Sequence, residues 1–277
     1  MMKNNIWLDG LRSVARMGET AVVAAKAGIK YATEKPSNAK LMRETFESLG
    51  STYIKLGQFI ASTPSLFPRE YVEEFQGCLD QTPTLPFSYV QQVLASEFAG
   101  RDLSQIFASI DETPLASASI AQVHAAKLVT GENVVIKVQK PGVETILYTD
   151  LNVLHWAAKL LEKAVPKVKF ASLADIVDEI KTRMVREVDF IEEAQNLDDF
   201  IQYLNISGNQ AATAPKVYHQ FSTRRVLTMQ RLYGVSLTDF DVVKKYAKDP
   251  TQVLITAMNT WFGSLMLCKS FHADLHA

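Results

Sequence analysis

The chain has 277 residues, 47% of them hydrophobic and 21% charged, so it has the composition of a globular protein that can bury one large core or two lobes. Its formal net charge of −1 gives no indication of a nucleic-acid partner. Cys78 and Cys268 lie far apart in the sequence, so we expect no disulfide framework and a reducing compartment such as the cytoplasm. No stretch of about 18 uncharged apolar residues predicts a membrane span, and we expect no signal peptide.

The first hundred residues predict helices. In residues 6–33, apolar side chains recur at helical spacing with Lys and Arg between them. Such a helix either lies on a membrane surface or packs against its own domain. Asp9 and Glu19 dilute the basic face, which favours packing. Further helices are predicted over 37–62, 69–80 and 87–98.

The pattern changes at about residue 115. The segments 121–129 and 133–139 are rich in apolar and β-branched residues and flank the tripeptide Thr-Gly-Glu, which predicts a β-hairpin. Pro141 and Gly142 end the second strand. No strand is predicted in the first hundred residues.

Helices are predicted again over 143–165 and from Ser172 to about residue 205, and Ser172 with Asp175 resembles a capping box. The segments "PKVYHQF" and "RRVLTMQRL" predict a second strand pair, and helices follow, with 250–269 strongly apolar. This order of elements predicts an α+β fold. Neither the G-x-G-x-x-G nor the G-x-x-x-x-G-K-[ST] phosphate-binding pattern occurs.

Lys137 lies in the middle of the second hairpin strand, "VVIKVQ". Alternation places it on one face of the strand with Val135 and Gln139. A lysine there is unfavourable unless its ammonium group reaches water or an anionic partner. The strand is therefore either an exposed edge or the equivalent of the kinase signature V-A-I-K, whose lysine holds nucleotide phosphates.

The segment "PLASASIAQVHAA", residues 114–126, lies where a kinase has its glycine-rich loop. Small side chains permit close approach of a backbone to phosphates, although alanine lacks the freedom of glycine at positive φ. The alternative is the start of a helix, since alanine favours helices. The small residues of this segment are Ala116, Ser117, Ala118, Ser119 and Ala121.

The acidic segment "REVDFIEEAQN", residues 186–196, contains Glu187, Asp189, Glu192 and Glu193. A solvated helix face is one explanation. The other is the kinase glutamate that pairs with the strand lysine. On one continuous helix, Glu187 and Glu193 would lie about 120° apart and serve different partners.

The segment "HADLHA", residues 272–277, resembles the start of a kinase catalytic loop, in which an aspartate accepts the hydroxyl proton of the substrate. His272, Asp274 and His276 also alternate as metal ligands might be spaced. This constellation alone does not predict a metal site, and we expect none in this chain.

Together, six segments in this order resemble the UbiB/AarF family of atypical kinase-like proteins, which is tied to ubiquinone and prenyl-lipid metabolism. "KLGQ" resembles the K-x-G-Q signature of the family, and "PLASASIAQVH" its alanine-rich loop. The remaining four segments resemble the family's lysine strand, acidic helix, hinge and catalytic loop, and they are "VVIKVQKPG", "EVDFIEEAQN", "VLTMQRLYG" and "HADLHA".

The resemblance implies roles for particular residues. Lys137 would hold the phosphates of ATP or ADP and pair with Glu193, and Asp274 would be the catalytic aspartate. Met229 and Arg231 would belong to the hinge that offers backbone groups to adenine. The alanine-rich loop, Ala116, Ser117, Ala118 and Ser119, would lie against the nucleotide. Lys55 would pair with Glu187, and with Gly57, Gln58 and Asp189 these two form the K-x-G-Q and E-x-D motifs that restrict access to the site.

The resemblance also implies a protein-kinase-like fold with an N-terminal helical extension. We expect a helical domain over 1–105, a small lobe with inserted helices over 106–232, and the beginning of the large lobe over 233–277. Gln230 stands where the family usually has Glu. The asparagine and the D-x-G aspartate that bind Mg²⁺ in the family would follow residue 277, so we expect no metal ligands in this chain, an incomplete large lobe and weak catalysis.

Two functions remain open from the sequence. The first is an ATPase or phosphotransferase that supports ubiquinone or prenyl-lipid metabolism. The second is a pseudokinase-type regulatory module that binds nucleotide without catalysis. Expected partners are the nucleotide and quinone or prenyl-lipid intermediates with their biosynthetic enzymes. The expected location is cytoplasmic, with peripheral contact at the inner membrane.

Overall fold

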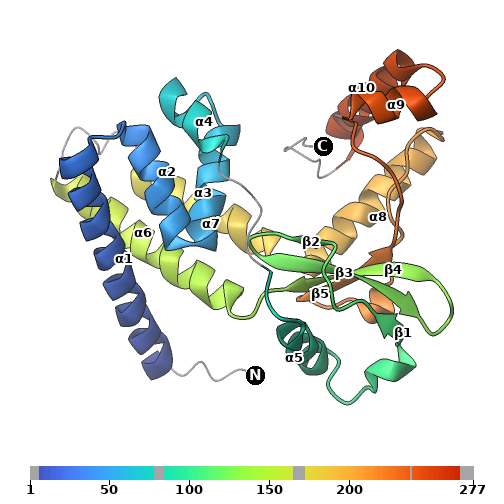
Figure 1. Cartoon of the computed structure of the whole chain (residues 1–277), viewed down its shortest axis with the longest axis horizontal. Helices are drawn as coiled ribbons and strands as arrows, with labels where there is room; N and C mark the ends of the chain where they lie inside the picture. Colours follow the sequence, from blue (N-terminus) through green and yellow to red (C-terminus); the bar gives the residue numbers. More distant parts are fainter. Residues whose placement is uncertain (1–5, 78–83, 165–171, 238, 269–277) are drawn as a thin grey trace. The chain divides into compact units, whose positions relative to one another are not determined.

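The computed structural model describes residues 6–77, 84–164, 172–237 and 239–268 (Figure 1). By their internal contacts these residues form two compact units. The first, here called the helical unit, comprises residues 1–85, 117–121 and 140–188, and the second, the sheet unit, comprises 86–116, 122–139 and 189–277. None of the helices among the described residues is long and apolar enough to cross a membrane.

Among the described residues, the helical unit contains six α-helices. Its core lies where α3, α6 and α7 meet, and Tyr53, Leu151 and Met184 are buried there. Long apolar stripes on these helices account for the packing, because each helix buries one face and leaves the other in water. The helices are α1 (Ile6–Glu34), α2 (Asn38–Leu49), α3 (Ser51–Ser62), α4 (Arg69–Phe75), α6 (Val143–Ala164) and α7 (Leu173–Glu187).

The predicted helix over 37–62 is two helices. Gly50 separates α2 from α3 and has a φ of 99°, a conformation that side chains other than glycine rarely adopt. Its N–H still donates to the carbonyl oxygen of Phe46, so the end of α2 is satisfied. The prediction of a single helix was wrong because the apolar periodicity continues across this turn.

α1 is attached to the helical unit by a buried ion pair. Arg16 Nε and Nη2 donate to the two carboxylate oxygens of Asp150 on α6, at 2.6 and 2.9 Å. Arg16 also donates to the carbonyl oxygen of Leu49 at the end of α2. The prediction that this amphipathic helix packs against its own domain is thereby confirmed for the described side chains.

The sheet unit contains one antiparallel sheet with the strand order β1-β3-β4-β5, and β2 pairs with β3 outside this path. The strands are β1 (Phe107–Ile110), β2 (Ala116–Ser117), β3 (Ala121–Leu128), β4 (Asn133–Gln139) and β5 (Val226–Gln230). The predicted hairpin is confirmed as β3 and β4, with Gly131 in the turn at a φ of 101°. Mixed helices and antiparallel strands confirm the α+β class.

Two helices of the sheet unit, α5 and α8, pack against strands of this sheet. α5 (Phe87–Glu97) contributes Val93 and Leu94 to the same core as Ile136 of β4. In the described connections, 3-10 helices form over Leu103–Gln105 and His219–Phe221. The remaining helices are α8 (Phe190–Ile206), α9 (Phe240–Tyr246) and α10 (Pro250–Leu267).

Two strand predictions were wrong. β1 was missed, since only four residues form it. The segment "PKVYHQF" was predicted as a full strand, but only Val217 forms an isolated bridge to Met229 before the chain turns into a 3-10 helix. β5 therefore pairs mainly with β4, and Lys137 faces Leu227 in the register.

The predicted long helix from Ser172 to residue 205 is also two helices, α7 and α8. Val188 ends α7, and Asp189 has extended backbone angles and begins α8 as its N-cap. The predicted capping box at Ser172 is absent, because Ser172 adopts a left-handed conformation and its side chain does not cap the helix. Instead Glu162 accepts a hydrogen bond from the N–H of Ala174 at 2.9 Å.

Candidate functional site

Lys137 is presented by the alternation of β4. Val134, Ile136 and Val138 are at most 2% exposed and hold one face of the strand in the core. Lys137 therefore points to the opposite face, where 24% of its side chain is exposed. The apolar alternation that builds the sheet is thus also what aims the ammonium group out of the core.

The partner of Lys137 is Glu193 on α8. The Nζ atom donates to both carboxylate oxygens of Glu193, at 2.8 and 2.7 Å, and 34% of the glutamate side chain is exposed. The same Nζ lies 5.0 Å from the ring centre of Phe190, which is fully buried. An ammonium group has three N–H donors, so this pairing leaves one for an anionic ligand.

Asp189 positions Glu193 through the start of α8. Its Oδ1 accepts from the N–H of Ile191 at 3.0 Å, and its Oδ2 accepts from Arg224 Nε at 3.0 Å. The N–H of Phe190 donates to the carbonyl oxygen of Arg224, at the approach to β5. Glu193 follows the cap by four residues, so the cap and its arginine anchor the first turn on which Glu193 lies.

The alanine-rich segment is extended and turned, not helical. Ala116 and Ser117 form β2, and the N–H of Ala118 donates to the carbonyl oxygen of Ala121 at 2.9 Å. Ser119 is 3% exposed. The alternative of a helix start is therefore wrong, and the small residues lie in a tight turn that leads into β3.

The hinge segment follows β5. The N–H of Gln230 donates to the carbonyl oxygen of Lys216 at 2.8 Å, and that of Arg231 donates to the carbonyl oxygen of Asn133 at 3.1 Å. The Arg231 guanidinium lies 4.9 Å from the ring centre of Tyr233. Met229 is half-buried in the strand, opposite Val135. Two of the backbone donors in this segment are thus already engaged.

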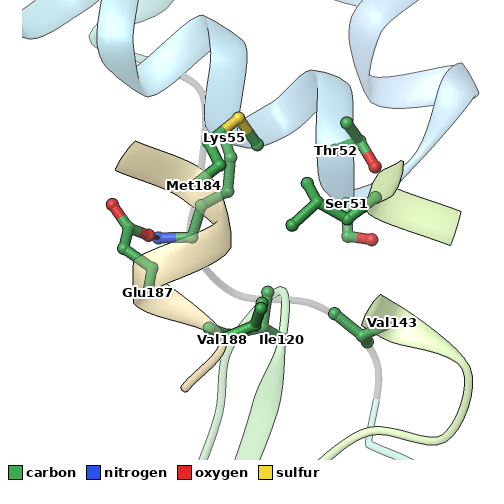
Figure 2. A pocket seen from close by; sticks show the side chains of 9 residues that line it. Ser51, Thr52, Lys55, Ile120, Val143, Met184, Glu187 and Val188 are labelled. Carbon is green, nitrogen blue, oxygen red and sulfur yellow. Dashed lines mark ion pairs between the residues drawn. The ribbon is translucent and has the colours of Figure 1, made fainter. Parts of the chain in front are cut away.

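The second expected pair, Lys55 with Glu187, is present in the helical unit. Lys55 Nζ on α3 lies 2.7 Å from Glu187 Oε2, at the last residue of α7, and half of the Glu187 side chain is exposed. Figure 2 shows the Lys55 side chain extending from its helix toward Glu187. Within the same K-x-G-Q segment, Gly57 is buried in α3 and Gln58 is half-buried.

This pair lines a small pocket (Figure 2). Its wall combines the first turn of α3, where Ser51 and Thr52 lie, with apolar side chains from the other helices and from the turn before β3. The apolar members are Ile120, Val143, Leu147, Met184 and Val188. The pocket is therefore apolar at its base and charged at one side.

The last predicted site residue belongs to the C-terminal segment of the chain. Asp274, with the rest of "HADLHA", lies outside the described residues. Across residues 6–77, 84–164, 172–237 and 239–268, no cluster of three or more His, Cys, Asp or Glu side chains is arranged to hold a metal ion.

Sequence reasoning missed the residues that support the site. Arg224 and Phe190 were not predicted, although an aspartate before an acidic first turn, as in "VDFIEE", is a usual signal of a helix start. It also missed a buried polar pair on β3, in which Gln122 Nε2 lies 3.3 Å from His124 Nε2. His124 Nδ1 lies 2.8 Å from the carbonyl oxygen of Asp111. Polar residues at alternate strand positions could have indicated this pair.

Comparison with solved structures supports the fold. A Mycobacterium tuberculosis protein solved in complex with erythromycin has a TM-score of 0.58 and 24% identity, and the match covers 95% of this chain and 61% of that one. At this level of identity the similarity shows the fold alone.

Comparison with curated sequences gives nearer relatives. An aarF domain-containing protein kinase of Arabidopsis thaliana, described as chloroplastic, is 52% identical over 85% of this chain and 44% of its own length. A probable protein kinase UbiB of Azotobacter vinelandii is 34% identical over 88% of this chain and 45% of its own length. The chain spans about half the length of the curated relatives it matches. Residues 77–277 match the ABC1 atypical kinase-like domain, and the chain therefore belongs to this family of atypical kinase-like proteins, which includes the UbiB and aarF proteins.

Proposed function

We propose that this chain binds ATP or ADP as the nucleotide-binding part of an atypical kinase-like protein. The observation that carries the proposal is the Lys137–Glu193 pair, in which a partly exposed strand lysine is oriented by two hydrogen bonds to a helix glutamate. Such a lysine places a fixed positive charge where nucleotide phosphates can reach it. Lys137 and Glu193 are the residues we propose for phosphate binding and its orientation.

Other residues complete the proposed site. The turn of Ala116, Ser117, Ala118 and Ser119 would approach the phosphates through its backbone, and the segment from Met229 to Arg231 would contact adenine. Since the N–H groups of Gln230 and Arg231 are engaged, a contact through this segment would use its carbonyl oxygens or require a local rearrangement. Asp274 would be the catalytic aspartate.

Mg²⁺ would accompany the nucleotide, because metal ions neutralise phosphate charge during transfer. The residues of this chain would hold the phosphates, and the asparagine and D-x-G aspartate that bind the metal in the family are not among them. We therefore propose binding as the activity of these 277 residues and expect phosphotransfer by them alone to be slow. In this proposal the chain has three functional parts. They are a helical domain over 1–105, a small lobe over 106–232 and the beginning of the large lobe over 233–277.

Lys55 and Glu187 are proposed as a regulatory pair of the K-x-G-Q and E-x-D motifs, together with Gly57, Gln58 and Asp189. Asp189 has a second task as the N-cap of α8. A lysine held by a glutamate at this motif would restrict which phosphate acceptors reach the nucleotide, by sterics and by charge. The pair would also hold α3 against α7.

The pathway proposed is ubiquinone or prenyl-lipid metabolism. It is supported by relatives named as probable protein kinases UbiB, of which this chain covers 44–45% of the length. The partners would be quinone or prenyl-lipid intermediates and the enzymes that make them. The proposed location is cytoplasmic, with peripheral contact at the inner membrane, since the intermediates of such a pathway are lipids.

The test of nucleotide binding is Lys137→Met. Removing one charge-assisted contact to a phosphate costs about 1.5–3 kcal/mol, so the affinity for a fluorescent ADP analogue should fall roughly 10- to 100-fold. Lys127→Met is the matched control, because Lys127 is an exposed lysine on the neighbouring strand β3. Equal affinity of both variants for the nucleotide would contradict the proposal.

The regulatory role of the K-x-G-Q motif is tested by Lys55→Ala. Loss of the pair should change both nucleotide affinity and the rate of ATP hydrolysis, while the free energy of unfolding changes by less than about 1 kcal/mol, because the glutamate is half exposed. Arg183→Ala is a control that removes another exposed ion pair of α7, with Glu179. An unchanged nucleotide affinity and hydrolysis rate in Lys55→Ala would rule out the regulatory role.

A further inference from the structure

The last two turns of α6 expose large apolar side chains. Trp156 is 65% exposed, Leu160 is 67% exposed and Leu161 is 45% exposed. The buried face of the same helix carries Leu151 and Ala158, so this helix already packs against its neighbours through another side. The exposed side chains therefore add nothing to the core of the helical unit.

Lysines surround these apolar side chains. Lys159 Nζ lies 5.7 Å from the ring centre of Trp156, and Lys163 is exposed one turn further along the helix. We call Trp156, Lys159, Leu160, Leu161 and Lys163 the α6 tip. It combines an aromatic ring, two leucines and two positive charges within eight residues.

The acidic residues near the α6 tip are engaged elsewhere or lie on the neighbouring helix. Between Trp156 and Ala164 the sequence has one acidic residue, Glu162. Its Oε1 accepts the hydrogen bond from Ala174 at the start of α7. On α7, Asp178 lies 2.8 Å from His155 Nδ1, and Asp175 is exposed in the first turn. Over residues 156–163, two lysines and the one carboxylate of Glu162 give a net charge of +1 (two minus one).

We propose that the α6 tip docks on an anionic lipid bilayer. Tryptophan favours the headgroup level of a membrane, leucine favours the acyl boundary, and a lysine can extend its stem along apolar surface while its charge remains with the headgroups. The two lysines are complementary to anionic headgroups. Lys159 lies beside the Trp156 ring, so its charge and the ring can reach the headgroup level together.

The small area of the α6 tip favours a lipid bilayer over a second copy of the chain as its partner. A stable protein–protein interface buries about 800 Å² on each partner. Three exposed side chains on two helical turns provide only a few hundred Å², on the order of 100–200 Å² each. That area is sufficient for shallow, reversible insertion into a membrane surface, where electrostatic attraction adds to it.

This inference rests on the peripheral membrane contact proposed above and names the surface that makes it. It does not depend on the nucleotide. The α6 tip and the Lys137–Glu193 pair belong to different units and share no residue. A charge change on α6 should therefore alter lipid binding and leave nucleotide binding as it was.

The experiment is sedimentation of the 277-residue chain with sucrose-loaded vesicles, either of neutral phosphatidylcholine or with about one third phosphatidylglycerol. Each lysine near an anionic surface contributes about fivefold to partitioning, so Lys159→Glu with Lys163→Glu should lower binding to anionic vesicles at least about 20-fold. Lys244→Glu with Lys245→Glu is the matched control, since it makes the same charge change at two exposed lysines of α9. A second variant, Trp156→Ser, should lower binding while preserving its dependence on salt.

The fluorescent ADP analogue is titrated into the same samples. The inference is supported if binding requires anionic lipid and the α6 variants lose it while the α9 variant keeps it. It is overturned if the chain does not bind vesicles, if the α6 and α9 variants lose binding equally, or if the α6 variants bind as wild type does. Self-association that the α6 variants abolish, without vesicle binding, would also overturn it and would identify a second copy as the occupant. Loss of ADP binding with retained vesicle binding would count against the nucleotide proposal alone.

Discussion

Two ion pairs of this chain use the same chemistry in different surroundings. In the helical unit, Arg16 donates two hydrogen bonds to Asp150, whose side chain is 1% exposed. In the sheet unit, Lys137 donates two hydrogen bonds to Glu193, whose side chain is 34% exposed. Both pairs are bidentate, and both join segments far apart in the sequence.

The difference lies in what each charge can still reach. Arg16 also donates to the carbonyl oxygen of Leu49, so its guanidinium is used by three helices of the fold. Lys137 has a partner on one side and water on the other. The two cations are similarly exposed, 20% for Arg16 and 24% for Lys137, so the contrast lies in the carboxylates. A pair whose carboxylate is buried holds structure, and a pair whose carboxylate reaches water can exchange a partner for a ligand. Breaking the first should therefore cost stability, and breaking the second should cost binding.

The largest effect is expected for Arg16→Met. It leaves the buried carboxylate of Asp150 without its cation, which costs about 3–5 kcal/mol of the free energy of unfolding. Denaturant unfolding followed by circular dichroism measures this. The double variant Arg16→Met with Asp150→Asn should recover part of the loss, because no buried charge is then left unpaired. If the double variant is no more stable than the single one, the loss comes from packing of the arginine stem.

A smaller effect on stability is expected from Tyr53, which is buried near the Arg16–Asp150 pair. Burial, with a contribution from the charge of Asp150, raises the pKa of Tyr53 to about 12 from its ordinary value of 10. Below pH 10 the phenol is neutral in both states. Above it the unfolded chain ionises first, so stability should fall as the pH rises and should be about 2 kcal/mol lower at pH 12. Tyr53→Phe should lack this component between pH 10 and 12. Identical pH profiles for the two proteins would exclude it.

The smallest effect concerns the open pair. Asp189→Ala removes the N-cap of α8 and should lower the free energy of unfolding by about 1 kcal/mol. Because Glu193 lies in the first turn of that helix, nucleotide affinity should fall a few-fold as well. Asp249→Ala is the control, since Asp249 caps α10 by accepting from the N–H of Gln252 at 3.0 Å. A loss of affinity in the control of equal size would assign the effect to general destabilisation.

The sequence predicted the parts of the fold that depend on local pattern. The β3–β4 hairpin followed from apolar alternation around a glycine turn, and the lysine on the outer face of the second strand, at 137, indicated the candidate site. The two lysine–glutamate pairs followed from the family resemblance, since no local rule connects residues 56 or 132 positions apart. Periodicity alone would have left these glutamates on a solvated helix face.

The missed features share a physical cause. At Gly50 and at Asp189 a helix ends and another begins without a change in apolar spacing, so the pattern predicted one helix each time. The decisive interactions are a backbone angle at Gly50 and a side-chain cap at Asp189, which depend on single residues. Phe107–Ile110 pairs with β3 across about 20 residues, and tertiary pairing of so short a strand leaves little trace in the local sequence.

The register of β4 against β5 decides more than the shape of the sheet. Lys137 faces Leu227, and its neighbours Ile136 and Val138 are buried. A slip of one residue would turn every side chain of the strand to the opposite face, placing the ammonium group in the apolar core and two branched aliphatics in water. Pairing in the shifted register is therefore unfavourable for two reasons, the burial of a charge and the exposure of apolar side chains. Lys137 therefore helps to specify the register of its own strand. Substitutions that make position 137 apolar should lower the free-energy difference between the native and the shifted register of β4.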